Sequence, residues 1–220
     1  MTTLGIIIRL RASILLGVPL VVALGCGSND PSSAASRRQL LIAVDVSDRT
    51  PERLLAYAGA AYRLQRGMHQ GDTVRIYEFA HAPELMYAGP PIRGRSQFNR
   101  KVASRFAPGG APMCQMGTRA HLTLERVFAD AHRQTSELSV VVLTDGGIEE
   151  LGPQVVKSLR SSVRAAARYS RLNHLLVGGV TDEWRSRWED WTAPLGDSAT
   201  VRGLNDLDSF SPDDLWTRSR

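Results

Sequence analysis

The chain has 220 residues and a mass of 24.1 kDa, which is enough for one domain with a complete hydrophobic core. Its formal net charge at pH 7 is +5. The sequence contains no run of basic residues with interleaved aromatic residues, so it gives little support to nucleic-acid binding.

The first 25 residues have the pattern of a signal peptide. They contain Arg9, Arg11 and no acidic residue, and an apolar segment from Ala12 to Ala23 follows that is short for a bilayer span of about 20 residues. The sequence Ala-Leu-Gly-Cys that ends at Cys26 resembles the bacterial lipobox, whose cysteine is lipidated and becomes the mature N-terminus. We therefore expect a lipid anchor on Cys26 that tethers the protein to a membrane of the cell envelope, outside the cytoplasm.

Two alternatives to the lipid anchor stay open. Ala23 and Gly25 are small enough for ordinary signal peptidase, which would give a secreted protein, and an uncleaved segment would be an N-terminal anchor. Cleavage before Cys26 removes two arginines and no acid, which lowers the formal charge from +5 to +3. Lipidation of Cys26 leaves Cys114, the other cysteine, without a partner for an intramolecular disulfide.

Residues 26–37 are mostly small and polar with one proline, which is typical of a flexible tether, so we place the domain at residues 38–220. Strands and helices alternate along that domain. The predicted strands are Leu40–Val44, Thr73–Phe79, Glu84–Tyr87, Leu138–Leu143, Leu175–Val180 and Ala199–Arg202. The predicted helices run from Thr50 to Gly67, Ser96 to Arg105, Thr118 to Ala131 and Pro153 to Tyr169, then around Trp184–Trp191 and after Pro212.

This alternation predicts an α/β fold: a doubly wound, mostly parallel sheet of six strands with helices on both faces, in a single domain. Glu84–Tyr87 follows its predecessor so closely that we expect an antiparallel edge strand there. Thr50 is the expected cap of the first helix, because Pro51 occupies the first helical position. Trp184, Trp188 and Trp191 recur at helical spacing and are expected in the core.

Two acidic residues follow the most apolar strands, Asp45 after the first and Asp145 after the fourth. Ligands of such sheets bind beyond the carboxyl ends of the strands, where the strand order reverses. If the first and fourth strands are neighbours there, the two carboxylates converge, and two nearby anions need a cation or a proton between them.

These residues resemble the metal-binding motif of the von Willebrand factor type A family. That motif has Asp-x-Ser-x-Ser after the first strand, a Thr on a middle loop and an Asp after the fourth strand. The chain has Asp45-Val46-Ser47, Thr118 and Thr144-Asp145-Gly146 in these places. The resemblance implies an Mg²⁺ site with Ser47 and Thr118 as direct ligands and Asp45 and Asp145 as carboxylate ligands or holders of bound water. It also implies that an acidic side chain of an as yet unknown protein partner completes the coordination.

Each motif residue also has a purely structural interpretation. Thr118 could cap the helix that follows it, Ser47 could be a turn residue, and Asp145 with two glycines after it could form a strand-to-helix turn. All three would have to coincide beside Asp45 for the site to be absent.

The sequence departs from the family motif at Arg49, which replaces the second Ser and has no acceptor atom for a metal. Either its side chain points away and the site lacks one ligand, or its guanidinium lies between Asp45 and Asp145 as a counter-ion. Asp48 could replace the missing ligand only in a rearranged loop. We expect Mg²⁺ binding to be weak or absent because of Arg49.

One enzymatic alternative also starts from Asp45. Its position at the end of a strand resembles that of the nucleophilic Asp in the Asp-x-Asp-x-Thr motif of haloacid-dehalogenase-like phosphohydrolases. The second Asp of that motif is the acid-base residue, but Ser47 stands in its place here, and no lysine follows in a suitable place. The sequence favours a protein without catalysis, a protein-binding or scaffold module tethered to the bacterial cell envelope.

Overall fold

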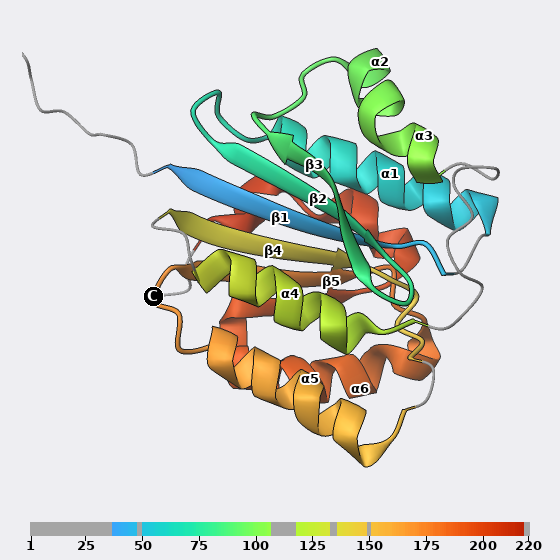
Figure 1. The fold of residues 1–220 in the computed structure, drawn as a ribbon, viewed down its shortest axis with the longest axis vertical. Helices are drawn as coiled ribbons and strands as arrows, with labels where there is room; N and C mark the ends of the chain where they lie inside the picture. Colours follow the sequence, from blue (N-terminus) through green and yellow to red (C-terminus); the bar gives the residue numbers. More distant parts are fainter. Residues whose placement is uncertain (1–36, 48–49, 107–117, 133–135, 149–150, 218–220) are drawn as a thin grey trace, which may run out of the picture. The chain divides into compact units, whose positions relative to one another are not determined.

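The computed structural model describes residues 37–47, 50–106, 118–132, 136–148 and 151–217, which form a sheet with helices on both sides (Figure 1). The strands are β1 (Arg38–Asp45), β2 (Thr73–Phe79), β3 (Pro83–Gly89), β4 (Glu137–Leu143), β5 (Leu172–Gly178) and β6 (Ala199–Arg202). The α-helices are α1 (Pro51–Arg66), α2 (Arg95–Phe98), α3 (Ser104–Phe106), α4 (Ala120–His132), α5 (Pro153–Ala166) and α6 (Asp182–Thr192). The π-helical turn η1 (Asn99–Ala103) joins α2 to α3, and η2 (Ala193–Ser198), η3 (Leu204–Ser209) and η4 (Pro212–Leu215) are 3₁₀ helices.

The strand order is β3-β2-β1-β4-β5-β6. Every pair of neighbouring strands is parallel except β2 and β3, so the sheet has one antiparallel edge strand. The predicted fold class is confirmed, and so is the contact between the first and fourth strands. Because the chain winds outward in one direction from β1 and in the other from β4, the strand order reverses between these two strands.

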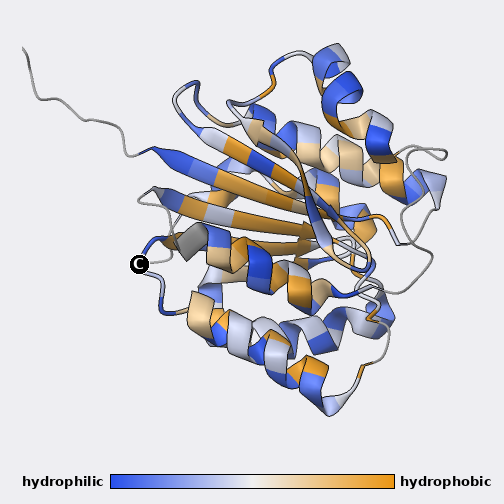
Figure 2. Ribbon diagram, in the orientation of Figure 1, coloured by the Kyte–Doolittle hydropathy of each residue, from blue (hydrophilic) through white to orange (hydrophobic). Residues whose placement is uncertain are grey.

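Alternate residues of each central strand enter two separate cores. On β1, Leu40, Ile42 and Val44 face a core shared with α1, the α2–η1–α3 segment and η3–η4. Leu41 and Ala43 face the opposite core, which α4, α5 and α6 cover. In Figure 2 the centre of the sheet is coloured mostly as hydrophobic, while polar residues colour much of the helices. Burial on both faces explains why these strands are continuous apolar runs.

Three predictions about single elements need correction. β5 begins at Leu172, three residues before the predicted strand, because Asn173 and His174 are buried within it. The predicted last helix is the short 3₁₀ helix η4, and η3 before it was not predicted. Thr50 is at the N-cap position of α1, but its side chain makes no capping hydrogen bond.

The tryptophan prediction holds for two of the three residues. Trp188 and Trp191 are buried in the core under α6, and Trp184 packs against it only partly buried. None of the helices described combines the length and the hydrophobicity that a membrane-spanning segment needs. The predicted signal peptide, the tether and Cys26 lie outside the described residues.

Candidate functional site

Three loops meet at the carboxyl edge of the sheet and carry the predicted site residues. Asp45 is the last residue of β1, and Val44 pairs with Leu143 of β4, so the loops after both strands leave the sheet side by side. The carbonyl of Phe79 at the end of β2 accepts a hydrogen bond from Val46. These contacts hold the loop after β1 and the loop after β4 against the strand ends.

The third of these loops precedes α4, and a backbone hydrogen bond joins it to the end of β2. The amide of Arg119 donates to the carbonyl of Ala80 over 2.8 Å. This places Thr118 opposite Ser47, with 2.5 Å between their hydroxyl oxygens. Residues 71 positions apart in the sequence therefore contact each other at the candidate site.

The hydroxyl groups of Ser47 and Thr118 form a chain of hydrogen bonds that ends at Asp45. Ser47 donates both its amide, over 2.9 Å, and its hydroxyl, over 2.6 Å, to Oδ1 of Asp45. A serine hydroxyl has one hydrogen, so in its contact with Thr118 the Ser47 oxygen is the acceptor and Thr118 the donor. The Ser47 hydrogen thus goes to the carboxylate and the Thr118 hydrogen to Ser47, and both oxygens keep lone pairs for a cation.

Asp45 is a buried carboxylate, with 2% of its surface exposed. The Thr144 hydroxyl donates to its Oδ2 over 2.7 Å, and the Thr144 oxygen in turn accepts from the Gly146 amide. The pKa of Asp45 is raised to about 6, chiefly by burial and to a smaller extent by the nearby Asp145, while hydrogen bonds from Ser47 and Thr144 act in the opposite direction. The local hydrogen bonds therefore do not fully replace the water and positive charge that this carboxylate lacks.

Asp145 has a different environment. Its Oδ1 accepts the Gly147 amide over 2.8 Å, and its Oδ2 accepts Nη1 of Arg53 over 3.3 Å. About a quarter of its side chain is exposed, as is about a fifth of Arg53. A guanidinium from the first turn of α1 is therefore the cation that contacts Asp145 in the described part of the chain.

Sequence reasoning missed Arg53 and the role of Thr144. Arg53 could have been noticed, because a positive charge in the first turn of a helix is opposed by the helix dipole and needs a compensating anion. Arg49, the predicted counter-ion, lies outside the described residues, so its predicted position between Asp45 and Asp145 stays a prediction.

The donor set fits an oxygen-ligated divalent ion in part. Ser47, Thr118 and Asp45 supply hydroxyl and carboxylate oxygens of the type that Mg²⁺ prefers. Their hydrogen bonds bring these oxygens together from two loops far apart in the sequence. Within the described residues no three His, Cys, Asp or Glu side chains form a metal-binding group. Arg53 beside Asp145 opposes a second positive charge there.

No protein-family model matches the chain, and no curated protein matches it in sequence. Solved structures are similar in fold. A von Willebrand factor type A protein from Catenulispora acidiphila superposes with a TM-score of 0.57 at 15% identity, over 79% of this chain and 41% of that one. The pilus adhesin SpaC from Lactobacillus rhamnosus GG gives 0.59 at 13% identity, over 83% of this chain and 30% of that one.

A third similar structure matches over almost its whole length. An aerotolerance-related membrane protein from Bacteroides fragilis gives a TM-score of 0.56 at 16% identity, over 80% of this chain and 96% of that one. The chain thus spans less than half of the other two structures and nearly all of this one. Together with the strand order and the antiparallel edge strand, these similarities show that the chain has the fold of a von Willebrand factor type A domain.

Proposed function

We propose that the protein is a non-catalytic protein-binding module with a degenerate metal-ion site, tethered to the bacterial cell envelope. The observation that carries the proposal is the convergence of Asp45, Ser47 and Thr118 at the strand carboxyl ends. Two hydroxyls from distant loops meet beside a buried carboxylate at the point where strand order reverses, which is where ligands of such sheets bind. A pilus adhesin with the same fold supports binding as the function.

The state of Asp45 argues against the phosphohydrolase alternative. A nucleophilic carboxylate needs a free oxygen that can approach its substrate. Both oxygens of Asp45 accept hydrogen bonds, from Ser47 and from Thr144, and the side chain is buried. Asp45 is therefore better suited to orienting the hydroxyls of Ser47 and Thr118 than to attacking a phosphate.

The metal site is degenerate because arginines accompany its carboxylates. A guanidinium about 4 Å from a carboxylate gains roughly 4 kcal/mol at an effective dielectric of 20, before desolvation costs. Arg53 already makes such a contact with Asp145, and Arg49 replaces a hydroxyl ligand of the family motif. The partner's acidic side chain then meets either a weakly held Mg²⁺ or an arginine at this edge.

Replacing both Arg49 and Arg53 should restore metal binding. In calorimetric titrations with MgCl₂ we expect weak or no binding by the native chain, and affinity at least about tenfold higher, or 1.4 kcal/mol, for the Arg49→Ser, Arg53→Gln double variant. Adding Thr118→Ala to the double variant should abolish the gain, because Thr118 supplies a ligand. Arg66→Gln, at the far end of α1, is the matched control and should leave binding unchanged.

Two results would contradict this proposal. Tight Mg²⁺ binding by the native chain that neither arginine substitution changes would show a complete metal site. A double variant that binds Mg²⁺ no better than the native chain would show that the converging oxygens do not form a metal site at all.

A further inference from the structure

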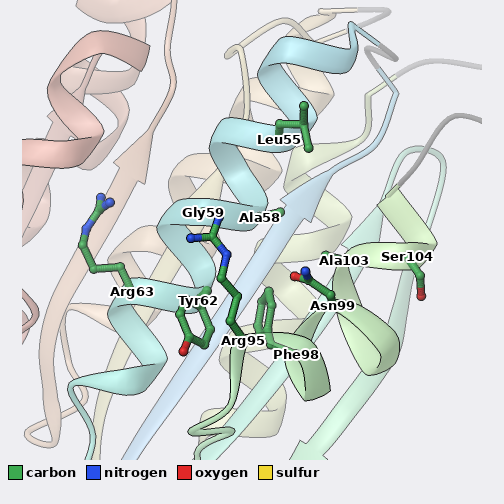
Figure 3. A pocket seen from close by; sticks show the side chains of 10 residues that line it. All are labelled: Leu55, Ala58, Gly59, Tyr62, Arg63, Arg95, Phe98, Asn99, Ala103 and Ser104. Carbon is green, nitrogen blue, oxygen red and sulfur yellow. The ribbon is translucent and has the colours of Figure 1, made fainter.

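A groove of about 600 Å³ lies between α1 and the α2–η1–α3 segment. Figure 3 shows the residues that line it: Leu55, Ala58, Gly59, Tyr62 and Arg63 from α1, and Arg95, Phe98, Asn99, Ala103 and Ser104 from the helical segment. The Arg63 side chain points away from that segment. The rings of Tyr62 and Phe98 contact each other with centroids 5.2 Å apart. The lining therefore combines apolar and small side chains with the polar residues Arg63, Arg95, Asn99 and Ser104.

Two residues of α1, Leu55 and Gly59, lower the stability of the protein alone but suit a surface that binds a partner. Leu55 is 73% exposed, the most exposed large hydrophobic side chain in the described part of the chain. Gly59 is in the interior of the 16-residue helix, where glycine is less favourable than alanine. A Cβ at Gly59 would meet no atom within 4 Å. Packing within the chain therefore does not require glycine there, and its absence of a side chain keeps the groove open.

The segment that forms the second wall is strongly basic. Between Glu84 and Glu125 the sequence contains no acidic residue but five arginines and one lysine. Arg105 is paired with Glu78 and Glu84, whereas Arg95, Arg100 and Lys101 are exposed and make no ion pair with any described residue. In Figure 3 the Arg95 side chain extends along the groove toward Gly59.

Acidic groups on the opposite wall do not neutralise this charge. Glu52 is exposed in the first turn of α1, and Asp208 of η3 pairs with Arg63 over 2.6 Å. Arg66 adds a further positive charge at the end of α1. The groove therefore has an apolar part beside Arg95, Arg100 and Lys101, which pair with no described acidic residue, and a complementary occupant offers apolar side chains flanked by carboxylates.

We propose that this groove binds an acidic amphipathic helix of a partner protein. Apolar side chains at positions i, i+3, i+4 and i+7 of that helix would pack on Leu55, Gly59 and Tyr62, as in other helix-in-groove complexes. Its Asp and Glu residues would pair with Arg95 and Arg100. The surface is independent of the metal-ion site, because none of its lining residues belongs to the loops around Asp45.

A random library of displayed 18-residue peptides, selected on the purified full chain, tests this proposal. We expect the selected peptides to be enriched in Asp and Glu with apolar residues at helical spacing. A synthetic selected peptide should bind in fluorescence anisotropy with an affinity that falls as NaCl rises from 25 to 300 mM, because the rim contacts are screened.

Matched variants separate the groove from the rest of the surface. Gly59→Gln fills the groove and should weaken peptide binding at least tenfold, whereas Gly71→Gln, also in open space, should change it less than twofold. The Arg95→Glu, Arg100→Glu double variant should also lose tenfold or more, and Arg164→Glu with Arg168→Glu on exposed positions of the opposite face should not. Thr118→Ala should leave peptide binding intact, whatever it does to Mg²⁺.

Several outcomes would overturn the proposal. One is a selected set without acidic enrichment, or peptides that bind the Gly59→Gln variant equally well. Another is the absence of peptide binding together with Arg95-dependent binding to phosphatidylglycerol vesicles, which would assign the basic surface to a membrane. A third is sedimentation of the native chain as a dimer that Gly59→Gln dissociates, which would make a second copy the occupant.

Discussion

At the scale of single residues, the hydrogen-bond donors and the cation around Asp45 and Asp145 determine the properties of the candidate site. Ser47 donates its hydroxyl hydrogen to Asp45, Thr118 donates to Ser47, and both hydroxyl oxygens keep lone pairs. Asp145 accepts hydrogen bonds from the Gly147 amide and from Arg53. Two carboxylates at one edge of the sheet are thus satisfied in different ways. Asp45 relies on neutral hydrogen-bond donors and has a raised pKa, and Asp145 relies on a cation.

The raised pKa of Asp45 predicts a pH-dependent stability. Its pKa increases from the ordinary value of 3.8 to about 6 on folding, so between these pH values the folded chain binds more protons than the unfolded chain. The contribution of Asp45 to the free energy of unfolding then falls as pH rises and stays low above pH 6. In urea unfolding with EDTA present, Asp45→Asn should gain about 2 kcal/mol relative to the native chain between pH 4 and pH 7.

The change between the two pH values is the informative quantity, because asparagine also alters the hydrogen bond with Thr144 and shifts stability at every pH. Asp72→Asn is a suitable control, since Asp72 is also buried but accepts amides of Arg38 and His69 at the other end of the sheet. Parallel pH profiles for the native chain and Asp45→Asn would refute the raised pKa.

The sequence predicted the positions of the site residues but not their electrostatics. Asp45, Ser47, Thr118 and Asp145 were identifiable because strand ends and a spaced motif can be recognised from residue types alone. Arg53 was missed because its contact depends on the direction in which α1 leaves the first loop. That direction is set by packing of Leu54 and Tyr57 against the sheet, which no local pattern specifies.

At the scale of elements, prediction succeeded where hydrophobic periodicity was strong. β2 and β6 have the predicted bounds. β5 begins earlier than its apolar run because cross-strand contacts accommodate its polar residues: His174 contacts Thr200 over 3.0 Å, and Asn173 donates to Glu137. Such partners are distant in sequence, so hydropathy alone placed the strand too late.

A buried glutamine of α1 bonds the backbone just before the α2–η1–α3 segment. Gln65 accepts the Ile92 amide and donates to the Ile92 carbonyl, each over 2.6 Å. Gln65→Met keeps the volume but leaves both backbone groups unpaired, which should lower the free energy of unfolding by about 2–4 kcal/mol in urea titrations. Gln97→Met, on the exposed side of α2, should change it by less than about 0.5 kcal/mol. Equal effects of the two substitutions would show that the buried contact contributes nothing to stability.

At the scale of the whole molecule, the topology explains why one edge of the sheet can carry a site. The order β3-β2-β1-β4-β5-β6 places the two central strands on either side of the reversal point, each buried on both faces. The strands then hold the loops that bring Asp45, Ser47 and Thr118 together. The sequence predicted this arrangement because alternating apolar strands and amphipathic helices have few right-handed, unknotted solutions.

The proposed anchor extends this arrangement to the envelope, with residues 26–37 as a polar tether between Cys26 and β1. Each buried methylene of an acyl chain contributes about 0.8 kcal/mol to membrane binding, so two or more chains hold a protein stably. We therefore expect the mature protein to fractionate with membranes and to have acyl chains on Cys26, detectable by mass spectrometry. Cys26→Ser should either block processing or release the protein into the soluble fraction.

The other cysteine provides the control for that experiment. Cys114→Ser changes the same functional group within the domain, and it should leave the acylated mass and the membrane fraction unchanged. If Cys26→Ser has the same mass difference from the precursor and the same fractionation as the native chain, then the lipid anchor is wrong. Simple secretion predicts both proteins in the soluble fraction after cleavage, whereas an uncleaved N-terminal anchor predicts both in the membrane at precursor mass.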